Sequence, residues 1–109
     1  MTLQSIDQYG PHFQIKVISS LLTHKDFLVN IHDILDYEDF GNTAHKWIIK
    51  EILKYYEKYH TTPSMEILKV ELQKESSDVL QLSIKEQLRE AYKASEDDLK
   101  YVQEEFSTF

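Results

Sequence analysis

Five histidines are the residues of this sequence whose chemistry could hold a metal ion. They are His12, His24, His32, His45 and His60. No two of them stand four residues apart on one predicted helix, the spacing that presents two imidazoles to one zinc ion. The segment Glu57-Lys58-Tyr59-His60 matches half of a di-iron motif, but the sequence holds no second copy. We therefore expect no metal ligands.

The sequence also lacks the residues that nucleophilic catalysis and nucleotide hydrolysis require. It has no cysteine, and no serine stands in the Gly-rich turn that exposes a hydrolase nucleophile. Gly10 and Gly41 are the only glycines, so a phosphate loop of the form Gly-x-x-x-x-Gly-Lys-Ser/Thr is excluded. We expect no catalytic residue and no cofactor-binding residue in this chain.

One group of residues has the chemistry of an interaction surface. We call it the Trp47–lysine face, and it consists of Lys46, Trp47, Lys50, Lys54 and Lys58. A tryptophan surrounded by cations is a frequent interface anchor, and this face could contact a phosphate backbone or an acidic partner. The alternative is an ordinary solvated helix face, with Trp47 lying over a neighbouring loop.

The elements that position these residues are expected to be helices. Apolar residues recur at helical spacing in about six segments, at 13–22, 23–35, 43–59, 63–72, 80–92 and 99–109. Glycine and proline number two each, too few for the turns of most β folds. The predicted fold is all-α, a compact orthogonal bundle of about six helices.

The segment 43–59 is expected to form the central helix of the bundle. Its apolar residues cover nearly half of the helix circumference, and they are Ala44, Ile48, Ile49, Ile52, Leu53, Tyr55, Tyr56 and Tyr59. Before it, 37–42 is predicted to be a loop or single turn whose aromatic residues tuck under the helices. After it, Thr62 and Pro63 are predicted as the N-cap and first residue of the next helix.

The last apolar stripe reaches the end of the sequence without a capping residue. It comprises Leu99, Val102, Phe106 and Phe109. The stripe either closes the core or packs on another chain, and we expect Phe106 and Phe109 to contact a partner. The chain thus divides into a flexible segment at 1–12, a helical core at 13–95, and a segment at 96–109. Because the stripe ends without a cap, that last segment is expected to continue in a longer protein.

Charge and hydropathy restrict the partners of the chain. Its 109 residues carry a formal net charge of −7, made up of −4 over 1–40, +1 over 41–75 and −4 over 76–109. An acidic domain is a poor general DNA binder, because nucleic acid is a polyanion. No apolar run approaches the ~18 residues of a membrane span, and no signal peptide is recognisable. We expect a cytoplasmic protein without a membrane partner.

Several segments together resemble the N-terminal domain of DnaB-like replicative helicases, in the version carried by large tailed phages. The resemblance lies in FQIKVISSLLT at 13–23, Glu-Asp-Phe at 38–40, Asn-Thr-Ala-His at 42–45, and the segments 48–59 and 62–72. Asp39-Phe40, His45, Pro63 and Leu72 fall in register with the family pattern. Gly41 departs from it, since the family often has an aromatic residue there. The similarity is good over 13–75 and looser over 76–109.

The resemblance implies the collar domain of a hexameric ring that encircles single-stranded DNA. In this family the N-terminal domain supports oligomerisation and docks primase, and in some members a helicase loader. ATP and magnesium belong to the C-terminal domain, so the resemblance implies no cofactor for these residues. It also implies that the segment 96–109 begins a helical hairpin or linker, and that the protein resides in a bacterial or phage-infected host cytoplasm. We expect a hexamer in the parent protein and a monomer or weak dimer for this chain alone.

Two other functions stay open at this point. The chain could be a free-standing phage adaptor that captures a host protein, which would require a natural end close to Phe109. It could also be a small DNA-binding module that places the helix at 43–59 in a groove. That function predicts salt-sensitive binding to duplex DNA.

Overall fold

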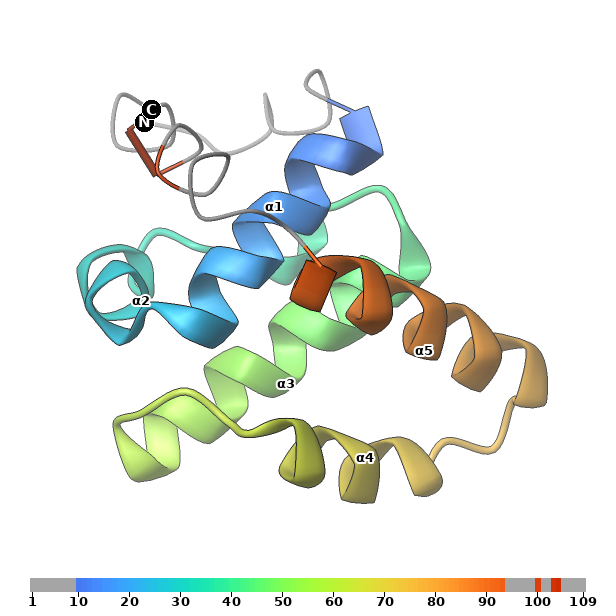
Figure 1. Ribbon diagram of the computed structural model, residues 1–109. Coiled ribbons are helices and arrows are strands. Elements are labelled where there is room, and N and C mark those ends of the chain that lie inside the picture. Colours follow the sequence, from blue (N-terminus) through green and yellow to red (C-terminus); the bar gives the residue numbers. More distant parts are fainter. Residues whose placement is uncertain (1–9, 94–99, 101–102, 105–109) are drawn as a thin grey trace.

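The central helix of the protein, α3 (Thr43–Tyr59), passes beneath α1 (Gly10–Thr23) in the computed structural model, which describes residues 10–93, 100 and 103–104 (Figure 1). A short helix, α2 (Lys25–Ile31), follows α1, and a single 3-10 turn, η2 (Tyr37–Asp39), precedes α3. The helices α4 (Met65–Gln73) and α5 (Asp78–Lys93) complete the described bundle. Both α1 and α5 pack on α3 and on each other.

The residues of α3 confirm the prediction of a central helix. Ala44, His45, Ile48, Ile49 and Ile52 are all buried along its inner face. The helix begins where its N-cap, Asn42, accepts a hydrogen bond from the backbone N–H of His45 at 3.1 Å. It ends at His60, whose backbone is left-handed with a φ of 59°. The observed bounds are those predicted from the sequence.

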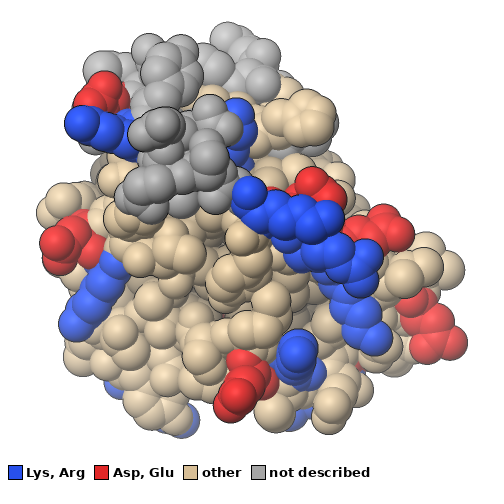
Figure 2. Space-filling model, in the orientation of Figure 1, with Lys and Arg blue, Asp and Glu red and all other residues tan. Residues whose placement is uncertain are grey.

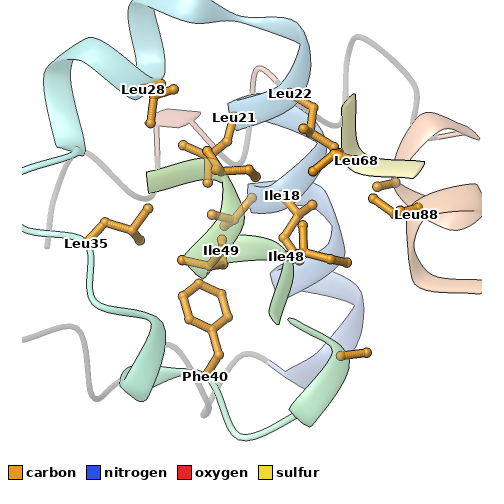
Figure 3. Close-up of a cluster of buried hydrophobic side chains, with 14 of the residues drawn as sticks. Ile18, Leu21, Leu22, Leu28, Leu35, Phe40, Ile48, Ile49, Leu68 and Leu88 are labelled. Atoms are coloured by element: carbon orange, nitrogen blue, oxygen red, sulfur yellow. The ribbon is translucent and has the colours of Figure 1, made fainter. Parts of the chain in front are cut away.

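The turn before α3 places an aromatic side chain in the core, as the sequence predicted. Phe40 follows η2 and is completely buried, and Figure 3 shows its ring directed toward Ile49 of α3. Tyr37 is half-buried and packs against the same core. The turn itself is stabilised where the Asp36 carboxylate accepts the backbone N–H of Glu38 at 2.9 Å.

A single hydrophobic core joins the described elements. Figure 3 shows its centre, to which α1 contributes Ile18, Leu21 and Leu22, and α3 contributes Ile48 and Ile49. The rest of the fold contributes Leu28 of α2, Leu35 and Phe40 on either side of η2, Leu68 of α4 and Leu88 of α5. Because the burial is shared, no described helix is expected to stay folded without its neighbours.

The helix count differs from the predicted number of about six. Within residues 10–93 there are five α-helices and the 3-10 turn, and none of the described residues forms a β-strand. The sixth predicted helix falls mostly outside the described residues. Lys100, Gln103 and Glu104 are described there, and all three are helical. The all-α class is therefore confirmed, whereas the described part of the bundle has one helix fewer.

Two helix ends and the burial of one residue differ from the sequence predictions. The N-cap of α4 is Ser64, whose Oγ accepts the Ile67 N–H at 3.3 Å, and the predicted cap Thr62 is wrong. The Thr62 hydroxyl instead donates to the Leu21 carbonyl at 2.9 Å, so this side chain makes a tertiary contact with α1 and does not cap α4. Ile34 is 46% exposed because α2 ends before it, and Tyr59 is 54% exposed at the end of α3.

Candidate functional site

The Trp47–lysine face lies entirely on α3. Lys50, Lys54 and Lys58 are exposed, whereas Lys46 is half-buried. These residues recur at four-residue spacing, so the row winds slowly around the helix instead of following its axis. The face presents mainly the three C-terminal lysines to solvent.

Trp47 has a different environment from its lysine neighbours. Its side chain is half-buried and packs against the hydrophobic core. The predicted arc of α3 placed Trp47 among the lysines, but the residue lies at the border between the polar and the apolar face. Replacing Trp47 would therefore remove core packing as well as surface. The lysines are the cleaner probes of this face.

The lysines of this face have only weak local partners. The Lys50 ammonium lies 5.5 Å from the centre of the Tyr37 ring, and Lys58 lies 5.4 Å from that of Tyr59. The exposed Lys54 forms an ion pair at 3.8 Å with the largely buried side chain of Glu51. Burial raises the pKa of the Glu51 carboxyl, and the Lys54 charge opposes that shift. The ammonium groups of Lys50, Lys54 and Lys58 are themselves exposed, and contacts at these distances contribute little energy, so the cations stay available to a partner.

The second group of predicted partner-binding residues falls outside the described residues. This group comprises Leu99, Val102, Phe106 and Phe109. Between them the structure describes Gln103, whose side-chain N–H donates to the Ser20 hydroxyl of α1 at 3.4 Å. Its backbone is helical, as the sequence predicted for this segment.

A groove between α4 and α5 is the surface feature that sequence reasoning missed. It has a volume of about 670 Å³. Apolar side chains line it from both helices, namely Met65, Leu72, Leu88 and Tyr92. Four cations and two amides line it as well, namely Lys69, Lys85, Arg89, Lys93, Gln73 and Gln81. The four-residue spacing of Lys85, Arg89 and Lys93 could have indicated a basic row, but only the tertiary fold brings Lys69 opposite.

One of the five histidines is buried in a polar cluster. His45 Nδ1 lies 2.9 Å from Oε1 of Gln14 on α1, and His45 Nε2 lies 2.6 Å from Oε1 of Gln87 on α5. Burial lowers the pKa of His45 below its ordinary value, and the hydrogen bond with Gln87 opposes this. The imidazole thus links α1, α3 and α5, a contact that no spacing in the sequence predicts.

Two other histidines, His32 and His60, lie beside Tyr56. The ring centres of His32 and Tyr56 are 4.6 Å apart, and those of Tyr56 and His60 are 6.0 Å apart. Across the described part of the chain, no three His, Asp or Glu side chains are grouped closely enough to hold a metal ion. Nor does any described helix combine the length and apolar character needed to cross a bilayer.

The comparisons with known proteins identify the family. The model of the DnaB-like helicase N-terminal domain matches residues 14–104, most of the chain. Neither the search of curated proteins nor that of solved structures returns a match. The match begins within α1, includes all of α2 to α5, and agrees with the all-helical fold described above. The chain therefore belongs to the family of DnaB-like helicase N-terminal domains.

Proposed function

We propose that this chain is the collar domain of a hexameric replicative DNA helicase of the large tailed-phage type. It supports assembly of the ring around single-stranded DNA, and it docks primase or a helicase loader during DNA replication. The observation that carries this proposal is the family match over residues 14–104. The acidic net charge of −7 is compatible with a role in protein docking and unfavourable to general binding of DNA.

We propose that the chemistry of the parent helicase takes place in another domain. The N-terminal domain of a DnaB-like helicase is a non-catalytic domain. ATP and magnesium would bind a separate domain of the parent, because this sequence lacks a phosphate loop. We also propose that the parent protein unwinds DNA and that it acts in the cytoplasm.

The Trp47–lysine face is our candidate for the contact with primase. Its support is the exposure of Lys50, Lys54 and Lys58 on one helix of an otherwise acidic chain. Clustered cations steer an acidic partner and improve its affinity when the charges meet at close range. The C-terminal stripe that includes Phe106 and Phe109 is proposed to pair subunits.

Reversing two charges of this face should weaken primase binding. We expect the double variant Lys50→Glu/Lys54→Glu to bind the primase of the same genome roughly tenfold less tightly, because two attractive contacts become repulsive. Calorimetric titration of the purified chain with primase measures the affinity. The matched control is Lys85→Glu/Arg89→Glu, which makes the same change of net charge on α5. Equal binding by the parent chain and both variants would refute the assignment of this face.

The mass of the chain in solution tests the assembly part of the proposal. We expect a monomer or a weak dimer, because in this proposal other parts of the parent close the ring. Light scattering at several protein concentrations gives the mass directly. A hexamer that persists on dilution would contradict the prediction, since the chain would then assemble the ring unaided.

A further inference from the structure

The groove between α4 and α5 combines an apolar lining with cations on both helices. Met65 and Leu72 of α4 face Leu88 and Tyr92 of α5 across it. Leu72 and Leu88 are nearly inaccessible and belong to the core, whereas Met65 and Tyr92 are more open to solvent. The apolar surface that the groove offers to a partner is therefore supplied mainly by Met65 and Tyr92, and it is continuous with the core through Leu72 and Leu88. An apolar surface of this kind is the part of a binding site that supplies affinity.

The cations of the groove are largely unneutralised. Lys93 pairs with Glu90 at 3.9 Å, and both side chains are more than half exposed. For Lys69, Lys85 and Arg89, no carboxylate of the described residues comes within 4.0 Å of the charged nitrogens. None of the ten residues that line the groove is acidic. Figure 2 shows Lys and Arg side chains gathered in a row over α5 on this face.

The dimensions of the groove match a short helix. From Gln81 to Lys93, α5 advances twelve residues, or roughly 18 Å at 1.5 Å per residue. A partner helix of about three turns has that length, and apolar residues at i, i+3 or i+4, and i+7 would face the lining. Its flanking positions would face Lys69 on one side and the basic row of α5 on the other. Carboxylates at those positions would complement both.

We propose that the α4–α5 groove binds an acidic amphipathic helix of a partner protein. The site is separate from the Trp47–lysine face and does not depend on the collar assignment. Single-stranded DNA is the less favoured ligand, because a phosphate backbone gains nothing from Met65, Leu72 or Leu88. Tyr92 is the one aromatic side chain in the lining on which a base could stack.

Designed peptides test the charge and the apolar pattern separately. The first is a labelled 14-residue helical peptide with leucines at i, i+3, i+7 and i+10, flanked by glutamates. In the second peptide, lysines replace the glutamates, and in the third, alanines replace the leucines. Fluorescence anisotropy with the full 109-residue chain should show binding of the first peptide and at least roughly tenfold weaker binding of the other two.

Variants of the chain locate the binding site. Lys85→Glu/Arg89→Glu changes two exposed residues of the groove and should weaken binding of the first peptide roughly tenfold. Lys50→Glu/Lys54→Glu has the same change of charge on α3 and should retain the affinity of the parent within about twofold. The two variants separate this inference from the proposed function. The α3 variant should lose only primase binding, and the α5 variant should lose only peptide binding.

Three results would overturn the proposal. Equal binding of all three peptides, or binding of none, would show that the groove does not recognise this pattern. Binding of labelled oligothymidylate that Lys85→Glu/Arg89→Glu abolishes would identify a nucleic-acid site instead. Competition by a synthetic peptide with the sequence of residues 95–109, at lower concentration than the designed peptide, would assign the groove to a segment of this chain.

Discussion

Replacing Phe40 with alanine should lower the free energy of unfolding by about 3–5 kcal/mol, the largest effect expected from a single substitution here. The Phe40 side chain is completely inaccessible and lies beneath α3. Its removal deletes apolar burial and leaves a cavity that the surrounding helices fill only in part. Because a domain of this size has about 5–15 kcal/mol in total, the variant should be near the limit of folding. Urea titration followed by circular dichroism measures the change.

A milder variant and a surface control make the Phe40 result interpretable. Phe40→Leu keeps most of the volume and should cost less than Phe40→Ala, so it gives a value even if the alanine variant is unfolded. Val79→Ala removes an apolar side chain that is 81% exposed, and its effect should stay within about 0.5 kcal/mol. A loss below about 1 kcal/mol for Phe40→Ala would mean that η2 does not anchor the core.

Stability of the chain should decrease as the solution becomes acidic, and His45 should cause part of that decrease. Burial lowers the pKa of His45 in the folded chain from its ordinary 6.5. Just below about pH 6.5, the His45 imidazole is therefore protonated in the unfolded chain but stays neutral in the folded chain. The contribution of His45 to stability is complete above that pH and is lost as the pH falls through the folded value. Urea titrations at several pH values between about 7.5 and 4.5 follow this loss.

The variant His45→Gln should separate this titration from other pH effects. Glutamine carries no proton in this range, so the unfolding free energy should vary less with pH than in the parent. At pH 7.5 the variant should be less stable by about 1–3 kcal/mol, because it lacks the imidazole hydrogen bonds to Gln14 and Gln87. Val79→Ala should keep the pH dependence of the parent. An identical pH dependence in His45→Gln would exclude His45 as the group responsible.

The buried position of His45 gives it a structural role that the sequence alone does not reveal. Its two ring nitrogens are engaged by Gln14 and Gln87, which stand 31 and 42 residues away in the sequence. No spacing rule relates such distant residues. The histidine that lies in register with the family pattern is thus a residue that joins α1, α3 and α5.

The sequence by itself determined the helical class and the central helix. Both follow from local properties, since the 3.6-residue period and the capping residues act within a few positions of each other. The bounds of α3 and the burial of Phe40 were predicted on that basis and are confirmed. The family could also be recognised from residues in register.

Only the tertiary structure decided which side chains meet across helices. Trp47 stands at the edge of a helical face, where burial depends on which elements pack beside the residue. In the folded chain its side chain packs against the core. Thr62 could have capped α4, but the Leu21 carbonyl lies within reach of its hydroxyl. The groove is formed by Lys69 on one helix and Lys85 and Arg89 on the next. Periodicity assigns residues to one face of one helix, whereas a groove depends on the distance between two helices, which packing of the whole core sets.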